Sequence, residues 1–218
     1  MTALSAFVPF VALKVARDMP AENIQHALRE VIIYFMEQTH AAVAEVFTTL
    51  MYADYEAFLN LPECRRMVAV EGVYLVPGSC QDDRRQTRWN PEWEEIPFAS
   101  YKGQPGWSID DGDGAETTLW VTPFERRERR LCVRYSWAPK RDAVCDVPDW
   151  LFERHAAAIA DGAMSYLHNN PADDAGSTRF AVLASRAFTA AIDDMKRNRA
   201  ALHGPRHMPI SSARFFGG

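Results

Sequence analysis

Hydrophobic residues between positions 20 and 38 recur at intervals of three and four, which is the period of an amphipathic helix. Pro20 opens this stretch, and a proline suits the first helical turn because its missing N–H would have no partner there. The pattern therefore predicts a helix that buries one apolar face. The residues of that face are Ile24, Ala27, Leu28, Val31, Ile32 and Phe35.

The pattern changes over residues 43–138 to short runs rich in β-branched and aromatic residues, separated by Pro, Gly and Asp clusters. Residues 130–137 alternate between apolar and more polar positions, which is the period of a half-buried strand. Short strands without intervening helices favour antiparallel pairing. The segment DDGDG, residues 110–114, predicts a tight hairpin turn between strands at 107–109 and 117–121.

Two further helical patterns occupy residues 146–170 and 177–200. The first is rich in Ala and Gly, whose small side chains let a neighbouring helix approach closely, so Gly162 is expected at a helix–helix contact. Asp146 and Ser177 are the expected N-caps of the two helices. The apolar stripe of the first helix comprises Leu151, His155, Ala158, Ile159, Gly162 and Tyr166, and that of the second comprises Phe180, Leu183, Ala184, Ala187, Phe188, Ala191, Ile192 and Met195.

These elements predict an α+β fold, a small helical bundle with an inserted antiparallel β module. One amphipathic helix cannot bury its apolar face alone, so the N-terminal helix and the two C-terminal helices are expected to pack together. The predicted bundle comprises 1–42 and 146–200, and the inserted module comprises 43–145. Residues 201–218 follow as an extended C-terminal arm, because its glycine and prolines forbid a helix.

The charge of the chain is unevenly distributed. The net charge is −5, but residues 195–218 carry five basic residues and no acid, so the preceding 194 residues carry −10. The chain as a whole is therefore not a general nucleic-acid binder. The four cysteines lack C-x-x-C spacing and are expected to be reduced thiols of a cytosolic protein. Residues 1–13 form the longest uncharged run, too short to cross a membrane and without a basic segment before it, so neither export nor membrane insertion is expected.

The sequence contains no phosphate-binding GxxxxGK[ST] motif, no GxSxG nucleophile motif and no HExxH zinc motif. His203 and His207 are four residues apart, but Gly204 and Pro205 lie between them and argue against a helical zinc pair. His155 lies on the apolar stripe of its helix and is expected to be a core or interface histidine rather than a catalytic base. We therefore expect no catalytic residue, no metal and no cofactor.

The segment RWNPEWEEIPF sets two tryptophans beside three glutamates and allows two interpretations. Aromatic and carboxylate side chains can form a carbohydrate site with a catalytic acid pair. Alternatively, the segment is a loop whose tryptophans pack on the sheet, which we favour because nothing local would hold one carboxyl group protonated. The residues concerned are Trp89, Glu92, Trp93, Glu94 and Glu95.

Three stretches, in order along the chain, resemble the head-to-tail adaptor family of tailed bacteriophages. ALREVIIYFMEQTHAAV is similar to the family's first-helix signature, and LWVTPFERRERRLCVRYSWAP is similar to its strand–hairpin–strand segment. DVPDWLFERHAAAIADGAMSYLHNNP is similar to its most typical helical segment. Together with the helix that contains AAIDDMKRN and the ending RF, the resemblance extends over residues 20–216.

The resemblance implies a structural virion protein, not an enzyme. Members of the family form a dodecameric ring beneath the portal, between the DNA-filled head and the tail, and extend the DNA channel. The implied partners are further copies of the chain, the portal protein, a tail or nozzle protein, and double-stranded DNA in transient, non-specific contact. The implied location is the neck of the virion, after synthesis in the host cytoplasm, with no membrane contact.

The resemblance also offers an interpretation of the aromatic C-terminus. The family's C-terminal arm reaches up to the portal, which implies that Phe215 and Phe216 are apolar anchors and that Arg214 meets acidic groups. Residues 88–107 are rich in aromatic side chains, which are costly to expose unless assembly covers them. The expected docking residues are Arg206, Ile210, Arg214, Phe215 and Phe216, and the expected contacts to the tail or a neighbouring subunit are Trp89, Trp93, Tyr101 and Trp107.

Two questions stay open at the level of sequence. The acidic excess of the first 194 residues could line a channel and repel DNA phosphates, or it could be an ordinary solvated surface. The protein could also belong to another class, as a tail-associated glycan-binding or cell-wall-degrading protein that uses the tryptophans and glutamates of residues 89–95.

Overall fold

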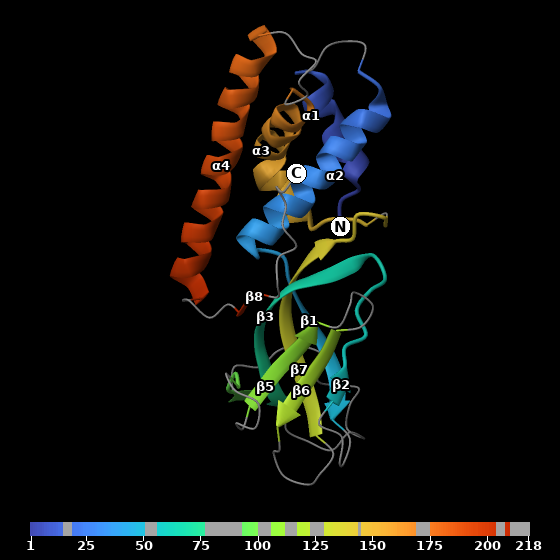
Figure 1. Ribbon diagram of the computed structural model, residues 1–218, viewed down its shortest axis with the longest axis vertical. Helices are drawn as coiled ribbons and strands as arrows, with labels where there is room; N and C mark the ends of the chain where they lie inside the picture. The colour runs from blue at the N-terminus through green and yellow to red at the C-terminus, as the bar shows by residue number, and fades with distance from the viewer. Residues whose placement is uncertain are drawn as a thin grey trace. The chain divides into compact units, whose positions relative to one another are not determined.

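The computed structural model of the protein combines helices and strands, and its chain forms two compact units (Figure 1). It describes residues 1–14, 19–50, 56–76, 93–99, 106–111, 117–122, 129–143, 145–168, 175–203 and 208–209. The predicted α+β class with antiparallel strands is confirmed. The helical unit comprises Met1–Ala42, Glu63–Arg66 and Ala138–Pro205, and the β unit comprises Val43–Pro62, Met67–Trp137 and Arg206–Gly218.

Helices occupy both ends of the described chain and strands occupy its middle. The helices are η1 (Leu4–Phe7), α1 (Val8–Ala12), α2 (Ala21–Thr39), α3 (Asp149–His168) and α4 (Ala175–His203). The strands are β1 (Val43–Leu50), β2 (Glu56–Phe58), β3 (Arg65–Val76), β4 (Glu94–Ile96), β5 (Gly106–Asp111), β6 (Thr117–Thr122), β7 (Arg129–Pro139) and β8 (Met208–Pro209).

The apolar face of α2 forms the centre of the helical unit, where it packs against α3 and α4 (Figure 1). Every residue predicted on this face is buried. The rings of Phe35 in α2 and Phe188 in α4 lie 6.1 Å apart between centroids. Gly162 of α3 lies between these helices: a Cβ atom there would be 2.6 Å from Val31 Cγ1 and 2.9 Å from the Phe188 ring. The helix–helix contact predicted at Gly162 is therefore confirmed.

Gly162→Leu will lower the free energy of unfolding by about 1–3 kcal/mol, because the added side chain overpacks a filled contact. This is a net loss, since replacing a glycine inside a helix would otherwise gain roughly 0.8–1.0 kcal/mol. Ala157→Leu is the matched control, because Ala157 is exposed on the same helix. Urea unfolding followed by circular dichroism measures both variants. Wild-type stability in Gly162→Leu would show that position 162 tolerates bulk and is not a close contact.

The N-terminal segment forms two short helices, η1 and α1, that the hydrophobic pattern did not reveal. Phe7 and Val11 are fully buried, and the Phe7 ring meets Phe152 of α3 edge-on at 5.2 Å between centroids. The terminal amino group of Met1 lies 2.7 Å from the carboxylate of Asp149. The segment is too short to display a helical period, so the sequence pattern could not distinguish it from an apolar coil.

The predicted N-cap of α3 is wrong. The helix begins at Asp149, so Asp146 lies outside it. Pro148 explains the later start, because a proline disfavours the helical conformation in the residue that precedes it. The Asp149 carboxylate instead accepts hydrogen bonds from the terminal amino group, at 2.7 Å, and from the Thr2 hydroxyl, at 2.6 Å. These two hydrogen bonds lower the pKa of Asp149.

Helix α4 differs from its prediction at both ends and along its apolar stripe. It begins at Ala175 and continues to His203, so Ser177 lies in the first turn rather than at the N-cap. Leu183 and Ala187 are exposed, although both belong to the predicted stripe, and so is Tyr166 of the α3 stripe. The buried positions of α4 follow a narrower line made by Ala181, Ala184, Phe188 and Ile192.

Among the described residues, the β unit contains a five-stranded sheet and a three-stranded sheet. The larger sheet has the order β1-β7-β3-β4, with β8 also paired to β3, and the smaller has the order β2-β6-β5. Trp107 of β5 pairs with Val121 of β6, and Ile109 pairs with Leu119. These pairs confirm the two predicted antiparallel strands, whereas residues 112–116, which connect them, lie outside the described residues.

Strand β7 is buried on both faces, which corrects the prediction of a half-buried strand. Leu131 and Val133 on the expected apolar face are fully buried, but so are Cys132 and Ser136 on the opposite face. The Ser136 hydroxyl donates a hydrogen bond to the carbonyl of Ala69, at 3.3 Å. A thiol and a satisfied hydroxyl can be buried at little cost, so their polarity in the sequence was a poor guide to exposure.

The chain returns to the helical unit earlier than predicted. The bundle was expected to resume at residue 146, but the helical unit resumes at Ala138 and also includes Glu63–Arg66. The main-chain N–H of Lys140 donates to the carbonyl of Cys64 at 2.9 Å. This pairing joins residues far apart in sequence, so no local pattern could indicate it.

Candidate functional site

The C-terminal arm is the first candidate site, and its beginning is regular structure. Residues 201–203 complete α4, so the predicted start of the arm at 201 is corrected. Met208 and Pro209 form β8, which pairs antiparallel with Val70 and Ala69 of β3 within the β unit. The predicted docking residues Arg206, Ile210, Arg214, Phe215 and Phe216 lie outside the described residues.

Two of the basic residues near the C-terminus are engaged within the helical unit. Arg199 is buried, and its Nη1 donates to the carbonyl of Thr39 at the end of α2, at 3.0 Å. Lys196 Nζ donates to the side-chain oxygen of Gln38, at 3.2 Å. Cations at a helix C-terminus satisfy carbonyls that lack partners within the helix and interact favourably with its dipole. The docking interpretation therefore depends on the basic residues beyond α4.

Trp93 and Trp107, two of the four predicted contact residues, are buried in the β unit, with 6% and 5% of their surface exposed. The Trp93 ring meets Phe47 edge-on at 5.9 Å, and the Trp107 ring meets Phe98 edge-on at 4.9 Å. Burial leaves these indoles little surface for a neighbour, so they are core residues of their own unit. The sequence analysis favoured a loop at RWNPEWEEIPF whose tryptophans pack on the sheet, and Trp93 is packed in its own unit in this way. Trp89 and Tyr101 lie outside the described residues.

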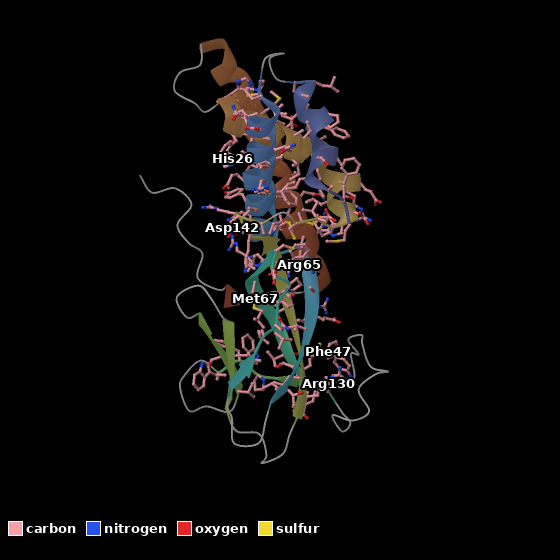
Figure 2. All side chains as sticks on the ribbon, turned by 90° about the vertical axis from the view of Figure 1, so that its right-hand side faces the viewer. His26, Phe47, Arg65, Met67, Arg130 and Asp142 are labelled. Carbon is pink, nitrogen blue, oxygen red and sulfur yellow. The ribbon has the colours of Figure 1, made fainter. Side chains whose placement is uncertain are left out.

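The described surroundings of Trp93 are a packed cluster. The Arg130 guanidinium lies 4.6 Å from the centre of the Phe47 ring, a cation–π contact, and both residues are labelled in Figure 2. Burial, reinforced by the charge of Glu45, raises the pKa of the Cys132 thiol to about 12, so this thiol stays protonated near neutral pH. The cluster comprises Val76, Trp93 and Cys132, with Phe47 and Tyr74 packed against it.

Two exposed aromatic residues of the β unit were not among the predicted contacts. Trp120 of β6 lies between Leu119 and Val121, which are both buried, and strand alternation places Trp120 on the opposite face. Phe98 is also exposed, beside the buried Trp107. The alternation of side chains in the sequence LWV could have indicated that Trp120 is exposed. Exposed aromatic side chains of this kind suit contact with another molecule.

Glu94 and Glu95 do not form the acid pair that a glycan hydrolase needs. Both are exposed and occupy successive positions of β4, opposite Leu75 and Tyr74 of β3. Successive strand residues point to opposite faces, so their carboxylates cannot flank one glycosidic bond. Glu92 lies outside the described residues. This geometry does not favour the alternative of a cell-wall-degrading protein.

His155 of α3 lies among aromatic rings, as its place on the apolar stripe predicts. Its ring centroid is 5.2 Å from that of Phe35 and 5.9 Å from that of Trp150. Its Nε2 is buried and has no hydrogen-bond partner within the described part of the chain. Burial lowers the pKa of His155, and the charge of Arg154 lowers it further, against an opposing effect of Asp194. The arrangement is that of a neutral packing residue.

Acidification will destabilise the wild-type protein more than the His155→Gln variant. The unfolded chain binds a proton at His155 near the ordinary pKa of 6.5, whereas the folded state resists protonation. The stability contributed by this group is therefore complete above pH 6.5 and is lost as the pH falls through the lowered folded pKa. Urea midpoints measured between about pH 7.5 and pH 5 test this expectation. Identical pH dependence in both proteins would contradict it.

A shallow apolar groove marks the surface of the helical unit where the chain after α1 meets α3 and α4. Its volume is about 420 Å³, and the ion pair between Lys14 Nζ and Asp161, at 2.5 Å, borders it. Leu13, next to Lys14 in the chain, is 88% exposed, and Leu183 in the groove is 54% exposed. Leu183 was predicted as core, so the sequence analysis missed this surface. The other lining residues are Met164, Ala184 and Ala187.

Comparisons with known proteins add no identification to this geometry. The chain matches no protein-family model and no curated protein sequence. Among the described residues, no three His, Cys, Asp or Glu side chains converge on a possible metal site. Where the chain is described, it also contains no helix with both the length and the apolarity needed to cross a bilayer.

Proposed function

We propose that the protein is a structural component of a tailed-phage neck, in which a dodecameric ring joins the portal to the tail and continues the DNA channel. The observation that supports the proposal is that each of the three family-like stretches falls on a regular helix or strand, in the same order along the chain. The first lies on α2, the second on β6 and β7, and the third on α3. A helical unit made from both ends of the chain, with an inserted β unit, is the organisation that the resemblance implies.

The C-terminal residues dock on the portal in this proposal. Met208 and Pro209 pair with β3, so the proposed docking residues stand on either side of this pairing in the sequence, with Arg206 before it and Ile210, Arg214, Phe215 and Phe216 after it. Phe215 and Phe216 act as apolar anchors, each contributing about 1.5–3 kcal/mol when buried. Arg206 and Arg214 attract acidic groups on the portal, an attraction that weakens as salt screens it.

Two exposed surfaces suit the remaining contacts of a ring. The groove beside Leu13 and Leu183 offers apolar surface to a neighbouring copy, and head-to-tail contacts between copies close into a ring when the rotation allows. Phe98 and Trp120 offer aromatic surface on the β unit to the tail or nozzle protein.

The negative charge of residues 1–194 supports a role in DNA passage rather than DNA retention. Affinity for DNA depends mainly on neutralising phosphates with basic residues, so an acidic channel wall keeps non-specific affinity low. Contact with double-stranded DNA is then transient, as a conduit requires.

Sedimentation of the protein with the purified portal of the same virus tests the proposal. The protein should enter the pellet with the portal, and the bound fraction should fall as salt rises without disappearing, because the phenylalanine anchors are apolar. Protein that stays in the supernatant at every salt concentration would contradict the proposal.

A further inference from the structure

Cys64 and Cys145 lie together in the helical unit, although strands β3 to β7 separate them in the sequence. The Cys64 side chain lies close enough to Cys145 to be, after burial, a cause of the raised pKa of the Cys145 thiol. Cys145 is 3% exposed, whereas Cys64 is half-buried, and both are free thiols. The two thiols are therefore neighbours, and Cys64 is the one more open to solvent.

The approach of the two thiols is held by contacts on both sides of the pair. The main-chain N–H of Lys140 donates to the Cys64 carbonyl, at 2.9 Å, which joins the two segments directly. Helix α2 then binds each segment through an acidic side chain, so contacts outside the two thiols also hold these segments. These ion pairs are Glu37 with Arg66 and Glu30 with Arg141, the latter at 3.5 Å.

We propose that Cys64 and Cys145 form a reversible disulfide bond that covalently joins the two ends of the segment containing β3 to β7. The oxidant is a small-molecule disulfide. The Cys64 thiolate attacks one of its sulfur atoms, which forms a mixed disulfide and releases one small thiol. The Cys145 sulfur then attacks the Cys64 sulfur, gives its proton to solvent and releases the second small thiol. Two protein thiols are thereby oxidised to one disulfide, and the small disulfide is reduced to two thiols.

The environment of the pair assigns the order of attack. Cys64 reacts first because its side chain is the more exposed. Burial, and then the neighbouring Cys64 side chain, raises the pKa of Cys145 to about 12, which keeps it protonated until its partner has reacted. Arg65, labelled in Figure 2, opposes this shift by lowering the pKa of Cys145, so it stabilises the thiolate as the second attack proceeds.

The bond restricts the unfolded chain. Closing a long loop removes conformational freedom from the unfolded ensemble, so the oxidised protein resists unfolding. The two cysteines are reduced in a cytosolic thiol buffer and oxidised in an aerobic external medium. Whether the disulfide bond is present therefore depends on the compartment. The inference concerns the isolated chain and does not depend on the proposed role in a phage neck.

Oxidation of the full-length Cys80→Ser protein with oxidised glutathione tests the proposal, and the substitution removes a third thiol that could compete. Peptide mapping by mass spectrometry should find the 64–145 linkage within one molecule. The melting temperature should rise by roughly 5–15 °C and return to its original value with dithiothreitol. The additional change Cys64→Ser should remove both effects and leave the melting temperature of the reduced protein nearly unchanged.

Three results would overturn the proposal. The first is a glutathione adduct on Cys64 without the 64–145 linkage, and the second is a linkage between molecules. The third is an intramolecular linkage that leaves the melting temperature unchanged. The variant Cys145→Ala, made in the Cys80→Ser protein, shows whether an adduct without linkage reflects only a slow attack by Cys145. This variant lacks the second thiol, so it should accumulate the glutathione adduct on Cys64, whereas the parent protein should convert that adduct to the disulfide.

Discussion

Deleting residues 210–218 will abolish attachment of the protein to the portal and change its melting temperature by no more than about 4 °C. The cut follows Pro209, so the pairing of β8 with β3 is retained and the described core of both units loses no residue. The deleted segment contains both phenylalanine anchors and Arg214. Co-sedimentation with purified portal measures the attachment, and differential scanning calorimetry measures the fold.

Point variants separate the apolar and charged contributions of the same segment. Phe215→Ala combined with Phe216→Ala should weaken binding at least about a hundredfold at all salt concentrations, because burial of two aromatic rings is lost. Arg214→Ala should weaken binding mainly at low salt, where charge attraction is least screened. Full binding by the truncated protein would refute docking through residues 210–218. A large loss of stability on truncation would show instead that the phenylalanines pack on the protein's own core.

Trp93→Ala will lower the free energy of unfolding by about 3–5 kcal/mol, the range observed when a large buried aromatic side chain is removed. Trp93 is packed in the cluster with Val76 and Cys132, and Phe47 meets its ring edge-on. The cavity left behind cannot collapse easily, because the neighbouring residues belong to paired strands. Urea unfolding followed by circular dichroism measures the loss.

Trp120→Ala is the matched control within the same unit. Trp120 is exposed on β6 and makes cross-strand contacts rather than core contacts, so its removal should cost about 1 kcal/mol or less. Equal losses in the two variants would contradict the assignment of Trp93 to the core. A stable Trp93→Ala protein that loses contact with the tail would restore its interpretation as a surface residue.

The helices that carry a long period were predictable, and the short ones were not. The apolar face of α2 repeats over several turns, so its buried residues followed directly from their spacing. Helix α1 contains only Val8–Ala12, and burial of Val11 depends on its contact with the rest of the helical unit, which local sequence does not encode. Leu183 shows the opposite error, because an apolar residue on a helix is buried only where a neighbour covers it.

The candidate sites were less predictable, since they depend on contacts between distant residues. The composition of residues 88–107 indicated aromatic surface, but Trp93 and Trp107 are covered by Phe47 and Phe98 from their own unit. The proximity of Cys64 and Cys145 follows from the return of the chain to the helical unit, which no motif marks. In contrast, the hairpin of β5 and β6 was predictable because its turn residues and alternation are local.

The central claim is that this protein forms a ring on a portal. Negative-stain electron microscopy of the protein mixed with the purified portal of the same virus tests it most directly. Class averages should show a second ring of twelve-fold symmetry stacked on the portal. Portal rings without added density, at protein concentrations well above those of the portal, would contradict it.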